Sequence, residues 1–75
     1  MENMEFYYLI NVSGKHGYSF MVCSADELYE EDVIESALEN GLFEDDIDAE
    51  YAIVDDLVSD RDIDHFRECG CLYEI

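Results

Sequence analysis

The stretch EFYYLINVSGKHGYSFMVC, residues 5–23, carries the strongest secondary-structure signal of the chain. Residues 5–12 are dense in aromatic and β-branched side chains without glycine or proline, which is typical of a strand. Apolar side chains occupy both faces of this strand, which indicates a central place in a sheet. Residues 13–17 contain two glycines able to take positive φ angles, as a hairpin loop requires, and residues 18–23 return as the second strand.

A helix is predicted directly after this hairpin. Residues 24–27, SADE, have the S-x-x-E spacing of a capping box, which marks a helix N-terminus. The gap in apolar residues after Leu28 leaves open a short turn there, with the main helix beginning at Glu30. Gly41 stands where a left-handed residue closes a helix, so the helix is expected to end at Asn40.

The last third of the chain is expected to add a strand, a helix and a strand. Residues 51–54 form a short apolar run that fits a strand, but residues 47–58 also fit helical spacing, so both interpretations stay open. Ser59 is a favourable N-cap for a second helix over residues 60–69. Residues 71–75 are expected to form a final short strand.

The predicted order is β-β-α-β-α-β in a single acidic domain spanning residues 1–75. Because each element must bury its apolar side against another layer, we expect a small α+β fold. Its sheet is predicted to be mainly antiparallel, with both helices packed on one face. The core is expected to contain Tyr8, Ile10, Phe20, Val22, Val33, Ala37, Leu38, Ile53 and Phe66.

The composition combines a strong negative charge with enough apolar material for a core. Hydrophobic residues make up 49% of the chain, with six Tyr and four Phe, so the charge does not indicate disorder. The 21 Asp and Glu stand against Lys15, Arg61 and Arg67, which gives a net charge of −18. Three cations cannot neutralise a useful number of phosphates, so direct nucleic-acid binding is excluded, and an anionic membrane surface is disfavoured. The expected partner is therefore positively charged.

Cysteine usage favours the cytoplasm. Cys23, Cys69 and Cys71 leave an odd thiol under any internal pairing, and the N-terminal residues lack the basic and apolar regions of a signal peptide. Reduced thiols are expected in that compartment. No stretch approaches the roughly 20 apolar residues of a membrane-spanning helix.

The sequence predicts no metal, no cofactor and no enzymatic activity. His65, Cys69, Cys71 and Cys23 hold donor atoms for zinc, but one residue between the last two cysteines is not a usual structural zinc spacing, and we prefer free thiols. Whether these four side chains bind metal is left open. The run D-x-D-x-E over residues 46–50 begins like a calcium-binding loop, but a tyrosine follows where that loop needs glycine. The chain also lacks a convincing nucleophile and base.

The segment of residues 26–56 carries fourteen Asp and Glu and no Lys or Arg. Because these charges repel one another and lower stability, a sequence that keeps them is expected to use the charge. On the expected helix, Glu31, Glu35 and Glu39 are spaced i, i+4, i+8 and form a column, and the helix dipole adds negative potential beyond its C-terminus. An ordinary solvated rim is the alternative explanation. The candidate partner-binding residues are Glu31, Asp32, Glu35, Glu39, Glu44, Asp45, Asp46 and Asp48.

The run Glu50-Tyr51-Ala52-Ile53, followed by Asp55, is similar to a short run in antirestriction proteins of conjugative elements. With its size, charge and acidic helix, the chain resembles the antirestriction and anti-CRISPR DNA mimics of phages and mobile elements, although antirestriction mimics are usually longer. The resemblance implies an inhibitor in the DNA-binding groove of a restriction or CRISPR nuclease complex, with carboxylates in place of phosphates. The partner is then the positively charged surface of a nucleic-acid-binding protein or complex. The chain would act as a monomer or homodimer, in the host cell cytoplasm if it is phage-encoded.

Two other functions stay open on the sequence alone. The chain could be an immunity or antitoxin-like inhibitor of one basic toxin or nuclease. In that case a few anchors such as Tyr29 or Phe43 matter more than the summed charge. It could also be a small acidic structural or interaction protein without an inhibitory role.

Overall fold

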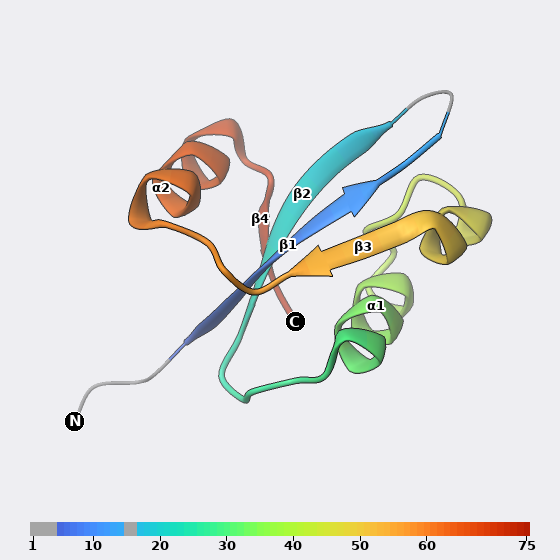
Figure 1. Cartoon of the computed structure of the whole chain (residues 1–75), viewed down its shortest axis with the longest axis horizontal. Coiled ribbons are helices and arrows are strands. Elements are labelled where there is room, and N and C mark those ends of the chain that lie inside the picture. Colours follow the sequence, from blue (N-terminus) through green and yellow to red (C-terminus); the bar gives the residue numbers. More distant parts are fainter. Residues whose placement is uncertain (1–4, 15–16) are drawn as a thin grey trace.

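The computed structural model describes residues 5–14 and 17–75 and has the predicted α+β class (Figure 1). Lys15 and His16, in the expected hairpin loop, lie outside the described residues, as do residues 1–4. Strand and helix order agree with the sequence, with one added 3-10 helix, η1, before the third strand. The elements are β1 (Phe6–Val12), β2 (Tyr18–Ser24), α1 (Glu30–Glu39), η1 (Asp46–Tyr51), β3 (Ala52–Asp55), α2 (Asp60–Cys69) and β4 (Leu72–Glu74).

The four strands form one mixed sheet in the order β3-β1-β2-β4. The first strand is central, as predicted: β1 pairs antiparallel with β2, where Ile10 lies opposite Phe20, and with β3, where Ile10 lies opposite Val54. The last strand, β4, pairs with β2 in parallel, with Met21 opposite Leu72. The sheet is therefore mainly antiparallel with one parallel edge.

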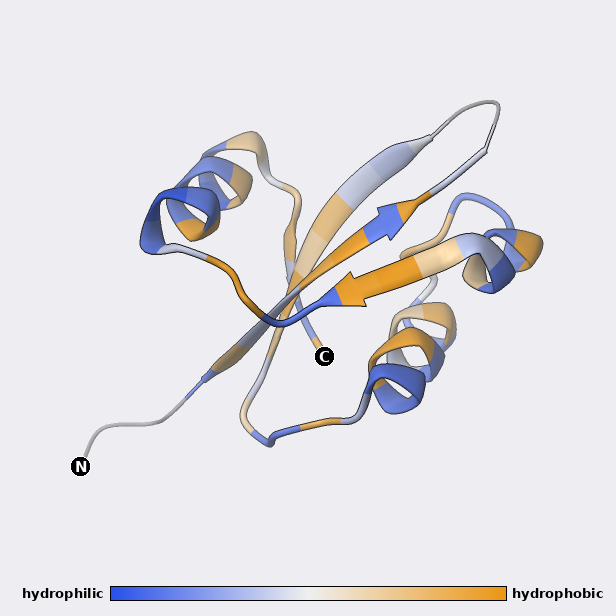
Figure 2. Cartoon of the chain, in the orientation of Figure 1, coloured by the Kyte–Doolittle hydropathy of each residue, from blue (hydrophilic) through white to orange (hydrophobic). Residues whose placement is uncertain are grey.

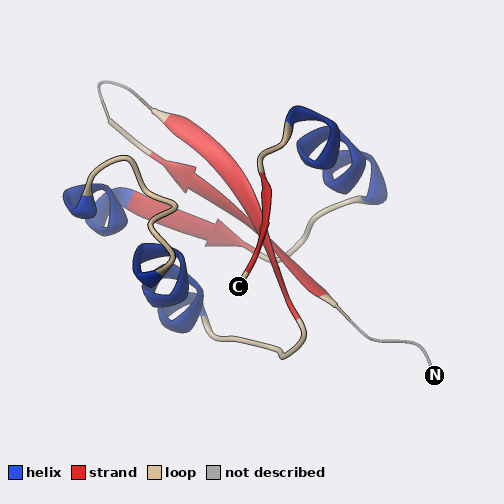
Figure 3. Ribbon diagram, turned by 180° about the vertical axis from the view of Figure 1, so that it is seen from behind, coloured by secondary structure: helices blue, strands red, loops and turns tan. Residues whose placement is uncertain are grey.

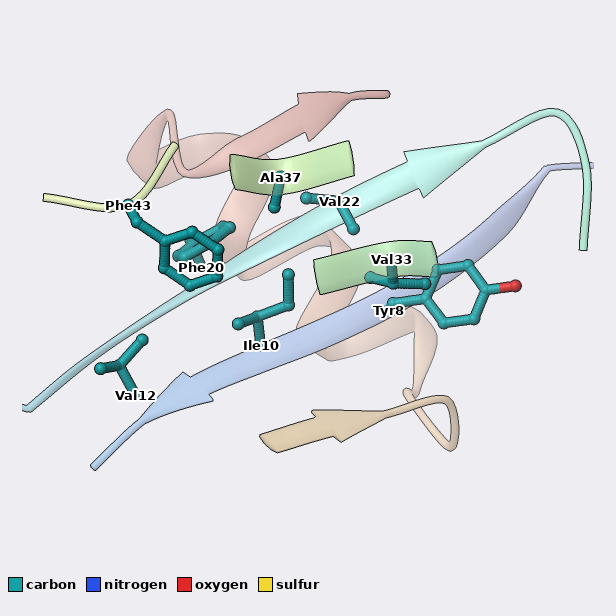
Figure 4. Packing of buried hydrophobic residues seen from close by; sticks show 8 residues of the cluster. All are labelled: Tyr8, Ile10, Val12, Phe20, Val22, Val33, Ala37 and Phe43. Atoms are coloured by element: carbon teal, nitrogen blue, oxygen red, sulfur yellow. The ribbon is translucent and has the colours of Figure 1, made fainter. Parts of the chain in front are cut away.

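The two helices lie on opposite faces of the sheet, so the expectation that both pack on one face is wrong. Strands β2, β3 and β4 run in the same direction, because β2 and β3 are both antiparallel to β1 and β4 is parallel to β2. The chain crosses from β2 to β3 through α1 and returns across the sheet from β3 to β4 through α2. Right-handed crossovers in opposite directions place their helices on opposite faces. Figure 4 shows α1 in front of the strands and α2 behind them. Figure 3 shows the whole fold from behind the view of Figure 1.

The main core lies between α1 and the sheet face formed by alternate residues of β1 and β2. Six of the predicted core residues are buried there, while Leu38 and Ile53 are exposed and Phe66 is half-buried. Ile53 is exposed because its neighbours Ala52 and Val54 face this core, and successive strand residues point to opposite faces. The buried cluster consists of Tyr8, Ile10, Val12, Phe20, Val22, Val33, Ala37 and Phe43 (Figure 4).

The opposite sheet face has a smaller buried area under α2. Met21 and Cys23 alternate with the main-core residues of β2, and both are buried. Helix α2 contacts β2 and β4, and its apolar residues Ile63 and Phe66 are half-buried. This second layer completes a three-layer arrangement of helix, sheet and helix.

The two helices begin in different ways. The capping box predicted at residues 24–27 does not form: the Ser24 hydroxyl accepts a hydrogen bond from the Asp26 N–H (3.1 Å), and α1 begins at Glu30, the alternative start. Tyr29 is its N-cap and offers no side-chain hydrogen bond to the helix end. At α2 the predicted cap is confirmed, and a full capping box forms, because the Ser59 hydroxyl accepts from the Asp62 N–H and the Asp62 carboxylate accepts from the Ser59 N–H.

The segment of residues 47–58, for which the sequence fits either a strand or a helix, contains both a helical turn and a strand. Residues 46–51 form η1, and β3 follows directly from Ala52.

Gly41 takes the predicted left-handed conformation (φ 69°) after α1. The Leu42 N–H donates to the Ala37 carbonyl oxygen (3.0 Å), which turns the chain back toward the core.

The uncapped start of α1 generates a stability prediction. Tyr29 is 84% exposed, so its replacement removes little packing. Tyr29→Ser supplies a hydroxyl acceptor for an end amide and is expected to raise the free energy of unfolding by about 1 kcal/mol. Urea denaturation measures the change. Tyr29→Ala is the matched control, because it removes the ring without adding an acceptor; equal stability of the two variants would contradict the capping explanation.

Candidate acidic interaction surface

Helix α1 presents its carboxylates to solvent because its other side is fixed in the core. Val33 and Ala37, one turn apart, are fully buried against the sheet. All four candidate residues of the helix, Glu31, Asp32, Glu35 and Glu39, are exposed. Glu30 joins Glu31 and Asp32 in the first turn, where the helix dipole favours negative charge. Glu30 is also exposed and adds a fifth carboxylate to the four predicted on this helix.

The acidic connection after α1 is held to the sheet by an aromatic contact. Phe43 is buried and packs edge-to-face on Phe20, with ring centroids 5.4 Å apart. Phe43 is therefore part of the core and is not accessible as a binding anchor, whereas Tyr29, the other anchor considered, is exposed. Directly beyond Phe43, the carboxylates of Glu44, Asp45 and Asp46 are exposed.

Two tyrosine hydroxyls from the hairpin hold the chain on either side of α1. The Tyr8 hydroxyl accepts a hydrogen bond from the Leu28 N–H before the helix (2.9 Å). The Tyr18 hydroxyl accepts from the Glu44 N–H after it (2.9 Å) and donates to Asp48 Oδ2 (2.7 Å). The acidic helix and connection are thus positioned by strands β1 and β2. Sequence reasoning missed this role, because tyrosines at these two strand positions first indicate core packing.

Two of the candidate carboxylates also have local structural roles. Asp48 is half-buried and accepts the Tyr18 hydrogen bond described above. Asp45 is the N-cap of η1, where its Oδ1 accepts from the Ile47 N–H (3.3 Å). Both side chains therefore stabilise the connection in addition to adding charge.

The eight candidates fall into two neighbouring groups on elements that contact each other, α1 and the segment that ends in η1. Glu31 and Asp32 line a surface hollow at the start of α1, and Glu35 and Glu39 continue along the helix. The second group borders a surface cavity of about 610 Å³ at the hairpin end of the sheet. This cavity is lined by Val12, Ser13, Gly14, Glu44, Asp45, Asp48 and Tyr51.

Charge is distributed unequally over the two helices. Helix α2, residues 60–69, carries four acids and two arginines, a net charge of −2. Arg61 and Arg67 are the cations within the described residues, and Arg67 Nη1 lies 3.6 Å from Asp64 Oδ1. Helix α1, residues 30–39, carries five acids and no cation. Four further acids follow it, at residues 44, 45, 46 and 48. The negative charge is therefore concentrated on the α1 side of the sheet.

The cysteines and His65 lie in different surroundings. Cys23 is buried in β2, and burial raises the pKa of its thiol above the ordinary value. Cys69 is exposed, with its Sγ 3.9 Å from His65 Nε2, and Cys71 is half-buried. Across residues 5–14 and 17–75, no three His, Cys, Asp or Glu side chains are grouped to hold a metal ion.

The hydrogen bonds of Tyr18 generate a prediction. Tyr18→Phe is expected to lower the free energy of unfolding by about 1–3 kcal/mol, because Asp48 loses a donor and the Glu44 N–H loses an acceptor. It should also speed hydrogen exchange at the Glu44 amide. Urea denaturation and NMR exchange measure the two effects. Tyr7→Phe is the matched control, since that hydroxyl bonds to Glu5 in an exposed position and its loss should cost little.

The same tyrosine predicts a pH dependence. Burial raises the pKa of Tyr18 above its ordinary 10.0, opposed by the Glu44 N–H and aided by the hydrogen bond to Asp48. The folded state therefore favours the neutral phenol, and this stabilisation is complete below pH 10 and is lost as pH rises through the raised pKa. Above pH 10 the wild type should lose stability more steeply than Tyr18→Phe. Parallel slopes in urea denaturation at several pH values would contradict this role.

The short run that resembles antirestriction proteins, residues 50–55, lies at the junction of η1 and β3. Glu50 and Tyr51 end η1, and Ala52, Ile53 and Asp55 belong to β3. Comparison of the chain with protein families, curated proteins and solved structures finds no match. None of the described helices combines the length and apolar character needed to cross a membrane.

Proposed function

We propose that this protein is an acidic inhibitor that mimics DNA and blocks the DNA-binding surface of a defence nuclease complex of the restriction or CRISPR type. The observation that carries the proposal is the concentration of exposed carboxylates on α1 and the connection after it, while both described arginines lie on α2, across the sheet. A solvated rim needs no such separation. A surface that replaces a phosphate backbone does need it.

The charge density supports the proposal. The longest dimension of the molecule is 42 Å. A DNA duplex of that length carries about 25 phosphate charges, at one per roughly 1.7 Å of axis. The net charge of −18 is about three quarters of that value, and half of it, −9, lies on α1 and the connection up to Asp48. A groove lined with Lys and Arg for DNA would therefore attract this protein over a comparable length.

The mode of action follows from electrostatics. Carboxylates of the α1 side take the places of phosphates and bind the Lys and Arg side chains of the enzyme, which is then closed to DNA. Such a charged surface speeds association by steering and makes affinity depend on salt. The packing of α1 and the connection against the sheet favours binding, because fewer side chains and loops must be ordered when the complex forms.

Charge reversal tests the proposal. Glu35→Lys or Glu39→Lys alone is expected to weaken inhibition modestly, by about fivefold, mainly through the association rate. The triple change Glu31→Lys, Glu35→Lys, Glu39→Lys should abolish inhibition and reduce the salt dependence of binding. The assay is DNA cleavage by purified restriction and CRISPR nuclease complexes, with unrelated duplex DNA as competitor. Displacement by that duplex is expected, because the mimic occupies the whole DNA groove.

A matched control separates position from total charge. Asp60→Lys, Asp64→Lys, Glu68→Lys makes the same change in net charge on α2 and leaves the capping residue Asp62 in place. This control should retain most of the inhibition. Circular dichroism verifies that both triple variants are folded. Full inhibition by a folded α1 triple variant, or equal losses in both, would contradict the proposal.

A further inference from the structure

Strand β3 exposes apolar side chains on the face that it turns away from the main core. Ala52 and Val54 pack against the core, and Ile53 between them is 59% exposed. Tyr51, the last residue of η1 and directly before the strand, is 53% exposed. Leu57, just beyond the strand, is 87% exposed. In Figure 2, β3 and the loop after it are coloured as hydrophobic, with a short hydrophilic stretch between them. We call Tyr51, Ile53 and Leu57 the β3 apolar surface.

The strand that carries this surface is at an edge of the sheet. β3 pairs with β1, and no strand in the described part of the chain pairs with its other side. Half of the backbone N–H and C=O groups of such a strand point outward and can pair with an added strand. Helix α2 contacts β2 and β4, at the far side of the sheet. An uncovered edge with apolar side chains beside it can accept a strand from a partner.

The charges around the surface indicate the chemistry of that partner. Glu50, Asp55 and Asp56 are exposed directly beside the apolar side chains. Tyr51 also lines the cavity bordered by Glu44, Asp45 and Asp48. A second copy of the chain would bring another −18 and set like carboxylates against one another. A segment with positive side chains around an apolar centre fits instead, and a cation can also bind the face of the Tyr51 ring.

We propose that the β3 apolar surface and the outer edge of β3 bind an extended, lysine- or arginine-rich segment of a protein partner. Apolar side chains of the segment contact Ile53 and Leu57, and its basic side chains pair with Asp55, Asp56 and the carboxylates beside Tyr51. The inference rests on the proposed function only in the positive charge of the partner. It adds a specific apolar anchor to a surface otherwise dominated by charge.

Two synthetic peptides of equal charge test the inference without the natural partner. One alternates lysine with valine and the other lysine with serine. Titration of the intact protein, followed by backbone amide NMR shifts, should map the valine peptide to Tyr51–Asp55 and Leu57, with at least about tenfold tighter binding than the serine peptide. Equal affinities, or shifts confined to α1, would overturn the inference.

Single variants identify the anchor. Ile53→Thr keeps a β-branched side chain, and Leu57→Ser lies outside every strand, so at least the second leaves the fold intact. Each should weaken binding of the valine peptide about tenfold and leave the serine peptide unchanged. Tyr29→Ser, at an exposed tyrosine elsewhere, should change neither. Equal loss in Tyr29→Ser would overturn the inference, as would self-association of the wild type in analytical ultracentrifugation that Ile53→Thr abolishes.

The docking site and the proposed DNA mimicry can fail separately, and the experiments distinguish the two outcomes. Failure of nuclease inhibition with the valine peptide still bound at β3 removes the DNA-mimic proposal and supports the docking site. Inhibition that survives both Ile53→Thr and Leu57→Ser, with no peptide preference, overturns the docking site and supports a purely charge-based mimic.

Discussion

Burial of one side of α1 against the hairpin is the interaction on which the rest of the structure depends. Val33 and Ala37 are fully buried, and they pack with Ile10 and Val22, which are also fully buried. A buried valine or isoleucine contributes about 1.5–3 kcal/mol, whereas a like-charge i, i+4 pair costs about 0.2–0.5 kcal/mol. A few core contacts therefore outweigh the repulsion along the glutamate column. The helix can carry its charge because it is anchored on the other side.

The charge asymmetry of the molecule is a consequence of topology. The acidic segment forms the first crossover and the arginine-bearing helix forms the second. Because the two crossovers run in opposite directions across the sheet, their helices occupy opposite faces. A charge difference between two parts of the sequence thus becomes a charge difference between two sides of the fold. With both helices on one face, the arginines would have lain beside the acidic helix.

Local signals predicted the elements. One local signal was wrong, the capping box at residues 24–27, and the other errors came from information that is not local. Aromatic and β-branched density identified the hairpin, and glycine and Ser59 marked helix ends correctly. Strand order and the parallel pairing of β4 depend on contacts between distant segments, so the placement of α2 was wrong. A four-residue apolar run does not reveal which face is inward, so the prediction that Ile53 lies in the core is wrong. The exposure of the α1 carboxylates followed from helical periodicity, but the hydrogen bonds of Tyr8 and Tyr18 required the hairpin and the acidic segment to be seen together.

Stability and binding are linked in a protein of this kind. The carboxylates of α1 and the connection repel one another in the free protein, and the hydrogen bonds of Tyr18 hold part of that charge in place. A cationic partner would relieve the repulsion while it binds, so each positive group that pairs with a carboxylate also favours the folded state over the unfolded chain. The unfolded chain spreads the same charges over a longer distance and offers the partner a weaker field. Binding of such a partner would therefore recover the free energy that the free protein loses to self-repulsion.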